Sequence, residues 1–208
     1  MKKSKAAATR NVVWQSSKVS REQREKKNGH RGAVVWLTGL PASGKSTIAH
    51  SVEHKLHQLD FQTIVLDGDN IRHGLCADLG FSIADRDENI RRAGEVAKML
   101  LERGMVVLVA LVSPIRSARD KVRASMRAVD FLEIYCRCPL DICRERDPKG
   151  LYARAERGEI PEYTGVSSPY EAPLDPALVV DTSNESVDES VDRLLQFLLD
   201  KLKRAKSL

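Results

Sequence analysis

The stretch that decides the fold lies at residues 33–47 and reads AVVWLT (33–38) followed directly by GLPASGKST (39–47). The first six residues form a continuous apolar run, which is typical of a strand buried on both faces. The residues from Gly39 to Ser46 match the pattern GxxxxGK[ST], and a strand before it with a helix after it is the context of a phosphate-binding loop. A chance glycine-rich turn would rarely match both, so the sequence predicts a site for a nucleoside triphosphate.

Each kind of residue in this loop has a chemical task. Gly39 and Gly44 accept backbone angles that a side chain would forbid, so the loop N–H groups can turn toward phosphate oxygens. Lys45 is expected to reach the β- and γ-phosphates of ATP, and the Ser46 hydroxyl is expected to bind Mg²⁺. The predicted ATP-binding residues of the loop are Gly39, Leu40, Pro41, Ala42, Ser43, Gly44, Lys45, Ser46 and Thr47.

Strand and helix signals alternate along the rest of the chain. Apolar runs predict further strands at 63–66, 105–112, 131–138 and 178–180, and helices are expected at 45–59, 87–103 and 114–129. Asp85 or Asp87 is the expected cap of the second of these helices. A last helix carries an apolar stripe made by Val187, Val191, Leu194, Leu195, Leu198 and Leu202. Strands separated by helices pair in parallel, so we expect an α/β, P-loop-type three-layer fold, with a five-stranded parallel sheet and helices on both faces.

The stretch from Asp147 to Pro176 breaks this alternation and is rich in Gly, Pro, Arg and Glu. A segment this long without regular structure is either a functional lid or a loose surface insertion. We favour a lid over residues 147–170.

Composition divides the 208 residues into two parts. Residues 1–31 hold ten basic and two acidic residues, a net charge of +8, which leaves −3 of the total +5 for the rest. We therefore expect a basic N-terminal extension over 1–31 and a P-loop domain over 32–204. No apolar run approaches the ~20 residues of a membrane span and no secretory signal is visible, so we expect a cytoplasmic protein without membrane contact. The four cysteines form no CxxC pair and are expected to be buried free thiols.

The acidic residues separate the classes of nucleotide enzyme. No NKxD motif of a GTPase is present, and the strand at 105–112 ends in Val112-Ser113-Pro114 without the acids of a motor ATPase. Acids instead end the strand at 63–66, as Asp67 and Asp69. Ligands bind outside the carboxyl ends of parallel strands, so both acids should face the loop. There they can hold a metal, for which Ser46 and Asp67 are the predicted ligands, or accept a proton from an attacking hydroxyl.

Four arginines follow the second acid, at Arg72, Arg86, Arg91 and Arg92. Such a cluster is either a solvated helix face or a pocket for an anionic acceptor. From the residues alone, the chain is predicted to be an ATP-dependent kinase of a small, negatively charged hydroxyl compound.

Several motifs occur together in a fixed order, and in combination they are more specific than a phosphate-binding loop alone. They are LDGDNIRHGL (66–75), DLGF (78–81), RDENIRR (86–92), Ser113-Pro114, DPKGLY (147–152), YTG (163–165) and PYEAP (169–173). Together they resemble the adenylyl-sulfate kinase (APS kinase) family, and NVVW (11–14) looks like its N-terminal segment. The resemblance covers nearly the whole chain.

The resemblance implies phosphorylation of the ribose 3′-hydroxyl of adenylyl sulfate (APS) by ATP, giving 3′-phosphoadenylyl sulfate (PAPS) for sulfate assimilation. It implies catalytic roles for Ser113, Asp69, Lys45 and Asp67. It assigns the APS site to Asp69, Arg72, Phe81, Arg86, Asn89, Ser113, Lys149 and Tyr163, with Phe81 and Tyr163 sandwiching the adenine. Arg144, and with it Arg146, would frame the ATP side. A homodimer with its N-terminal segment near the active site is also implied.

Ser113 is often described as a phosphoserine intermediate in this family, which would make the chain a phosphoprotein. A serine nucleophile needs an activating base, and no histidine is evidently placed for that role. Phosphoryl transfer at such loops generally proceeds by positioning and charge stabilisation, so we favour direct in-line transfer with Ser113 contacting substrate. Pro41-Ala42 departs from the Ser-Gly of many relatives and should tune nucleotide affinity without abolishing it.

Three alternatives stay open from the sequence. The acceptor could be a sugar or a nucleoside monophosphate, although the aromatic pair favours a nucleotide. The basic extension could contact nucleic acid, as in a nucleic-acid-binding ATPase, but it has one aromatic residue and no recognised binding motif, so no nucleic-acid partner is expected. A silent nucleotide sensor is the third, which the intact Lys45, Ser46 and Asp69 argue against.

Overall fold

The computed structural model describes residue 13 and residues 15–203 of the chain. Its centre is a five-stranded parallel sheet with strand order β2-β3-β1-β4-β5. The strands are β1 (Ala33–Thr38), β2 (Thr63–Asp67), β3 (Val106–Ala110), β4 (Phe131–Arg137) and β5 (Leu178–Asp181). The predicted strands and their parallel pairing are thus confirmed.

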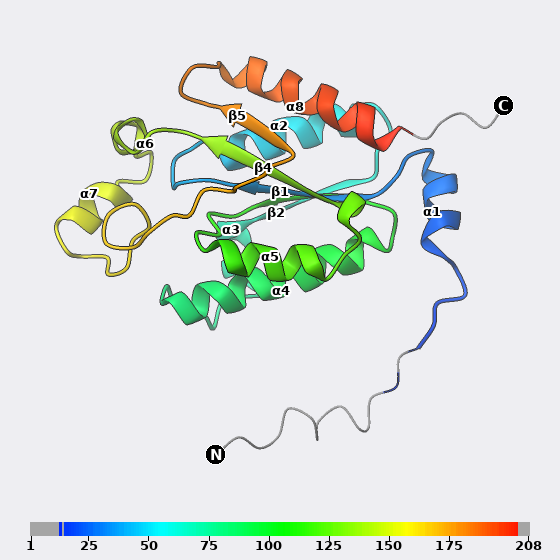
Figure 1. The fold of residues 1–208 in the computed structure, drawn as a ribbon, viewed down its shortest axis with the longest axis horizontal. Coiled ribbons are helices and arrows are strands. Elements are labelled where there is room, and N and C mark those ends of the chain that lie inside the picture. Colours follow the sequence, from blue (N-terminus) through cyan, green and yellow to red (C-terminus); the bar gives the residue numbers. More distant parts are fainter. Residues whose placement is uncertain (1–12, 14, 204–208) are drawn as a thin grey trace.

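Helices cover both faces of the sheet (Figure 1). One face packs against α2 (Lys45–Gln58) and α8 (Val187–Leu202), and the other against α4 (Ile83–Leu101) and α5 (Arg116–Ala124). The short elements are α1 (Arg21–Asn28), α3 (Gly68–Arg72), α6 (Leu140–Arg146), α7 (Leu151–Glu156) and a 3-10 turn at Ala128–Asp130. The predicted three-layer architecture is confirmed.

The continuous apolar run of β1 explains this layering. Side chains alternate across a strand, so Val35 and Leu37 enter the core under α2 and α8. Val34 and Trp36 enter the second core, under α4 and α5. A strand in the middle of two cores has no solvent face, and every residue of β1 is buried.

Several predicted boundaries were wrong. Helix α4 begins at Ile83, because the Ser82 hydroxyl accepts the Asp85 N–H at 3.2 Å and caps the helix four residues before the expected start. Neither Asp85 nor Asp87 is the cap. Helix α7 gives the expected lid segment regular structure of its own. On α8, Val187 is exposed and Leu195 is half-buried, so the buried stripe is narrower than predicted.

The basic extension is only partly described. Of the segment NVVW (11–14), which resembles the N-terminal segment of the family, all but Val13 lies outside the described residues. Helix α1 is described and begins with a capping box between Ser20 and Gln23. Arg21 of this helix lies buried against Asp130 at the start of β4. The division at residue 31 stays a proposal, and within it α1 is already fixed to the body.

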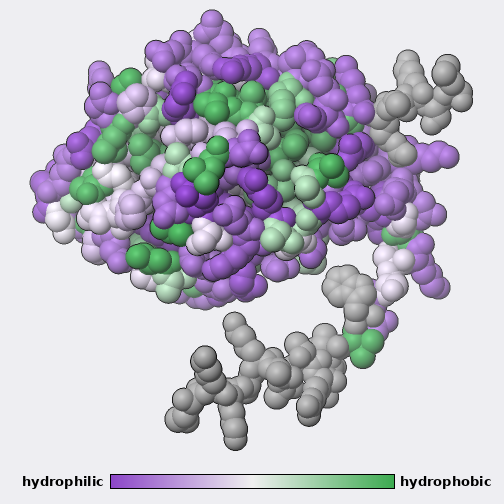
Figure 2. Space-filling view, viewed as in Figure 1, coloured by the Kyte–Doolittle hydropathy of each residue, from purple (hydrophilic) through white to green (hydrophobic). Residues whose placement is uncertain are grey.

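The surface agrees with the composition. Hydrophilic residues cover most of the face in Figure 2. No helix in the described part of the chain is long and apolar enough to cross a membrane. All four cysteines are buried and free, as predicted.

Candidate active site

A cavity of about 1070 Å³ opens at the carboxyl ends of the strands, between the phosphate-binding loop, α3, α4 and the 147–164 segment. It brings together most of the predicted site residues: Pro41, Ala42, Gly44, Lys45, Ser46, Thr47, Asp67, Asp69, Arg72, Phe81, Arg86, Asn89, Ser113, Lys149 and Tyr163. Gly39, Leu40 and Ser43 of the loop do not line it. The segment predicted as a lid therefore forms one wall of the cavity.

Lys45 and Gly44 begin α2 at the floor of this cavity. Gly44 has a φ of 84°, which lets the loop turn into the helix without steric strain. The Lys45 ammonium donates to the carbonyls of Gly39 at 3.0 Å and Leu40 at 2.7 Å. Burial lowers the pKa of Lys45 to about 8, although it lines the cavity. Phosphate oxygens can therefore replace these carbonyls as partners and hold the charged form.

Ser46 and Asp67 form an oxygen-rich corner beside Lys45. The Ser46 hydroxyl donates to Asp67 Oδ2 at 2.6 Å, and Asp67 Oδ1 accepts the backbone N–H of Asp69 at 2.9 Å. No group of three or more His, Cys, Asp or Glu side chains in the described residues could hold a metal alone. Mg²⁺ commonly takes one or two protein oxygens and completes its shell with phosphates and water, so these two residues fit that ion.

The part of the cavity that the sequence predicts to bind the acceptor combines aromatic and cationic groups. The Arg72 guanidinium lies 4.4 Å from the centre of the Phe81 ring, which is 54% exposed. Arg86 donates to the carbonyl of Phe81 at 2.8 Å and to that of Glu162 at 2.9 Å. It therefore ties together the two segments that carry Phe81 and Tyr163. Burial raises the pKa of Tyr163 to about 12.

The other two arginines of the cluster do not enter the cavity. Arg91 pairs with Glu88 at 2.7 Å, and Arg92 pairs with Asp78 at 2.6 Å and with Glu88 at 3.0 Å. These pairs form a solvated helix face, the alternative that the sequence left open. Asn89, on the same helix, is buried and lines the cavity with its Nδ2 atom unpaired within the described residues.

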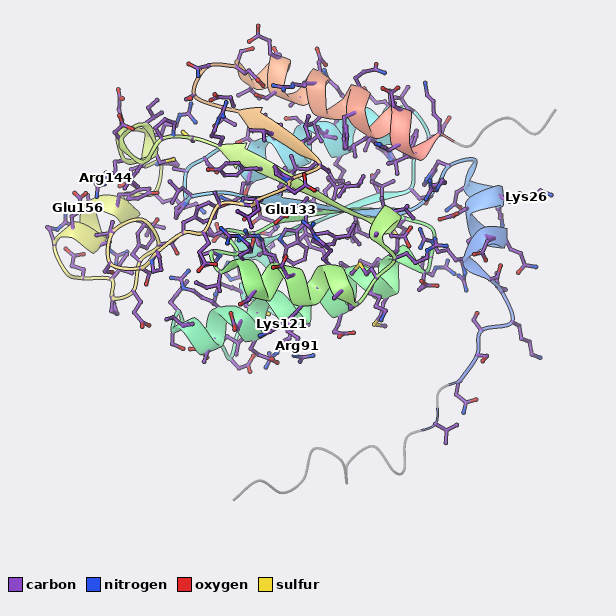
Figure 3. The ribbon with its side chains drawn as sticks, viewed as in Figure 1. Lys26, Arg91, Lys121, Glu133, Arg144 and Glu156 are labelled. Carbon is purple, nitrogen blue, oxygen red and sulfur yellow. The ribbon has the colours of Figure 1, made fainter. Side chains whose placement is uncertain are left out.

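Two charged residues of the 140–156 region differ in placement. Lys149 forms an ion pair with Asp69 across the cavity, and both side chains are largely exposed. Arg144 does not line the cavity, because its guanidinium pairs with Glu156 at 3.1 Å on the outside (Figure 3). Arg146 lines it instead and donates to the Thr182 carbonyl at 2.5 Å.

Ser113 lies buried at the end of β3, with a φ of 39°. Its hydroxyl donates to Thr38 Oγ1 at 3.0 Å and accepts from Trp36 Nε1 at 3.1 Å. Its carbonyl accepts from Arg119 at 2.6 Å. No carboxylate or imidazole in the described residues bonds the hydroxyl, so the geometry offers no base to activate it.

Some cavity residues were missed from the sequence. Thr182, directly after β5, lines the cavity, and its hydroxyl donates to the Ser43 carbonyl at 3.1 Å. The rule that ligands bind at the carboxyl ends of strands could have found it. Arg154 and Ile160 also line the cavity, and no motif in the sequence marks them.

The sequence model of the family described as adenylylsulphate kinase matches residues 31–181. The chain belongs to the adenylyl-sulfate kinase family. The adenylyl-sulfate kinase of Acaryochloris marina is 52% identical over 191 residues, covering 92% of this chain and 93% of the relative. The motifs between residues 66 and 173 that carry the resemblance lie inside the matched region, whereas NVVW (11–14) lies outside it.

Solved adenylyl-sulfate kinases share the fold. The APS kinase of Mycobacterium tuberculosis, solved in complex with AMPPNP and APS, is 48% identical with a TM-score of 0.76, covering 81% of this chain and 98% of that one. A hexameric APS kinase from Thiobacillus denitrificans is 30% identical with a TM-score of 0.64, covering 86% of this chain and 32% of that one.

Proposed function

We propose that this adenylyl-sulfate kinase transfers the γ-phosphoryl group of ATP to the ribose 3′-hydroxyl of adenylyl sulfate, giving PAPS for sulfate assimilation. The observation that carries this is the shared cavity, in which the phosphate-binding loop and the group formed by Phe81, Tyr163, Arg72 and Arg86 lie together. Aromatic faces bind a nucleobase and guanidinium groups bind phosphate and sulfate oxygens.

Within this proposal the donor side acts through charge. Lys45 neutralises the phosphoryl oxygens as negative charge shifts toward the leaving group. Ser46 and Asp67 would hold Mg²⁺, which supplies a Lewis acid beside the phosphates. Asp69 lines the same corner and orients the acceptor hydroxyl, for which it must exchange its present partner Lys149.

We infer direct in-line transfer. The Ser113 hydroxyl already bonds Thr38 and Trp36, and these contacts support a positioning role at the acceptor pocket. A covalent phosphoserine would need that hydroxyl freed and deprotonated.

The experiment measures ADP and product formation from γ-labelled ATP with adenylyl sulfate, AMP, gluconate or shikimate as acceptor. We expect label in PAPS with adenylyl sulfate, a far smaller rate with the other three, and no protein-bound label that chases into product. A sugar acid or AMP as the best acceptor would refute the proposed substrate. Label on Ser113 that turns over at the catalytic rate would refute direct transfer.

We also propose self-association as a homodimer; the hexameric relative from Thiobacillus denitrificans supports self-association but not a particular number of subunits. The cytoplasm stays the proposed location, with small-molecule substrates and no nucleic-acid partner. Sedimentation equilibrium of the full chain should give twice the 23.2 kDa mass of the monomer.

A further inference from the structure

Tyr152 connects the two halves of the cavity. It is the second residue of α7 and is only 1% exposed. Its hydroxyl donates to the carbonyl of Pro41 in the phosphate-binding loop at 3.1 Å. Its ring meets that of Tyr163 edge-on, with centres 5.2 Å apart and planes at 84°. One side chain therefore touches both the ATP loop and an aromatic residue of the acceptor side.

The hydrogen bond from Tyr152 satisfies the carbonyl of Pro41. A loop that turns its N–H groups toward phosphate turns carbonyls away from it, and a buried carbonyl needs a partner. Thr182 supplies the partner for the Ser43 carbonyl. Tyr152 supplies it for Pro41. Tyr152 is the member of this set that belongs to the 147–170 segment.

Apolar packing strengthens the same connection. A cluster under the segment consists of Cys138, Cys143, Tyr152, Ala155 and Tyr163, against which Leu40 and Ala42 of the loop pack. Ala42 has a φ of 61°, a left-handed conformation that costs a non-glycine residue roughly 1 kcal/mol or more. Such strain persists only where neighbours hold it, and the cluster is that neighbour.

Gly165 of the 147–170 segment also lies close to the phosphate-binding loop. A Cβ there would lie 3.3 Å from Leu40 Cδ2 and 3.0 Å from Leu140 Cδ1, and φ is 90°. The loop that carries Tyr163 thus rests directly on the outer face of the phosphate-binding loop. At this point a shift of one loop toward the other is resisted, because the Leu40 side chain already lies close to the Gly165 backbone.

We propose that Tyr152 is a positioning residue that couples acceptor binding to the phosphate-binding loop. A nucleotide stacked on Tyr163 holds Tyr152, and the Tyr152 hydroxyl holds the Pro41 carbonyl outward, so the loop N–H groups stay directed at the triphosphate. ATP and the acceptor therefore bind together more tightly than either binds alone. This rests on the proposed acceptor site at Tyr163.

The test measures this coupling at equilibrium on the full chain. Calorimetric titration gives the Kd of AMPPNP without and with saturating adenylyl sulfate, and the ratio of the two is the coupling factor. Tyr152→Phe removes the hydroxyl and keeps the ring. We expect it to reduce the coupling factor by about 2- to 12-fold, the range of one neutral hydrogen bond.

Tyr135→Phe is the matched control. Tyr135 lies on β4, its ring stacks on Tyr170 at 6.2 Å, and its hydroxyl has no hydrogen bond within the described residues. It should keep the wild-type coupling factor. A merely structural role for Tyr152 would shift the unfolding temperature and leave the coupling factor unchanged.

The outcomes separate the two proposals. Unchanged coupling in Tyr152→Phe, or a wild-type chain that binds both nucleotides without coupling, overturns the role of Tyr152 alone. A wild-type chain that does not bind adenylyl sulfate overturns the proposed function, and with it the coupling.

Discussion

Two ion pairs hold two outlying segments to opposite ends of the sheet, and they are built differently (Figure 1). Arg21 of α1 bonds both oxygens of Asp130, at 2.7 and 3.0 Å, and the two side chains are 6% and 2% exposed. Lys149 of the 147–170 segment pairs with Asp69, and these side chains are 60% and 64% exposed. The first pair lies behind the amino ends of the strands and the second lies at the catalytic end.

The difference follows from what each pair must do. A buried, two-hydrogen-bond ion pair between a guanidinium and a carboxylate holds the two segments in one relative position. Breaking it is costly, because a partner left behind is a buried charge. A solvent-exposed lysine pair is worth little to stability and exchanges readily. Within the proposed function Asp69 and Lys149 both bind substrate groups, and a weak pair between them suits that exchange, whereas Arg21 and Asp130 do not line the cavity.

Breaking the buried pair should give the largest effect. Arg21→Ala leaves two buried carboxylates without it, Asp130 beside the exposed Arg127 and Glu25 with no other ion pair in the described residues, and should lower the free energy of unfolding by about 3–5 kcal/mol. Urea denaturation measures it. Arg127→Ala is the control, because Arg127 bonds the same carboxylate at 2.7 Å but is 59% exposed, and should cost less than ~1 kcal/mol. Equal losses in the two variants would contradict the comparison.

The pH dependence of the stability lost in Arg21→Ala tests whether the ion pair with Asp130 is its cause. The pKa of Asp130 is lowered, because its bonds to Arg21 and Arg127 outweigh the burial that would raise it. Because the pKa of Asp130 is lower in the folded protein, its ionised carboxylate stabilises the fold fully above the ordinary pKa of 3.8. This stabilisation is lost as the pH falls from there through the lowered pKa. The gap between wild type and Arg21→Ala should therefore close in acid.

Breaking the exposed pair should change kinetics and hardly change stability. Lys149→Met should shift the free energy of unfolding by less than ~1 kcal/mol. It should raise the KM for adenylyl sulfate ~10- to 150-fold, the range of a hydrogen bond to a charged group. Lys55→Met is the control, since Lys55 forms a similarly exposed pair with Asp192 away from the cavity and should leave KM unchanged. A large stability loss in Lys149→Met alone would assign that pair to the fold.

Lys45 differs from both ion pairs. It is buried like Arg21, but its hydrogen-bond partners in the described residues are neutral oxygens and not a carboxylate. Burial lowers its pKa to about 8, so the free enzyme loses this charge as the pH rises through that value. Since only the charged form attracts phosphate, kcat/KM for ATP should fall above pH 8, by up to ~10-fold per pH unit. Steady-state rates from pH 6 to 10 measure it. A flat profile up to pH 10 would mean that the ammonium keeps its proton despite burial.

Local sequence was sufficient where the chemistry is carried by neighbouring residues. The phosphate-binding loop is nine consecutive residues from Gly39 to Thr47, so covalent spacing alone places Lys45 and Ser46. Apolar runs marked all five strands, most clearly β1 and β3, which are buried at every position in the middle of the sheet. The strand-end acids Asp67 and Asp69 then followed from the parallel topology.

Sequence was insufficient where a helix face or a distant contact decides. Arg144 and Arg146 are two residues apart on α6, and a helix turns about 100° per residue, so they point in nearly opposite directions. The sequence assigned both to ATP, but only Arg146 lines the cavity. The cap of α4 could not be read from local sequence either, because Ser82, Asp85 and Asp87 are all residue types that favour the N-cap position.

Two hydroxyl groups that bond carbonyls of the phosphate-binding loop could not be found from the sequence, for a physical reason. The Tyr152 hydroxyl meets Pro41 across 111 residues and the Thr182 hydroxyl meets Ser43 across 139, so no local pattern records either contact. The sequence by itself determined the fold class, the ATP loop and the strand-end acids, since these depend on spacing and periodicity. Only the tertiary structure decided which arginines enter the cavity, that Ser113 is bonded to Trp36 and Thr38, and that the 147–170 segment rests on the ATP loop, because packing selects these contacts from many that the sequence allows.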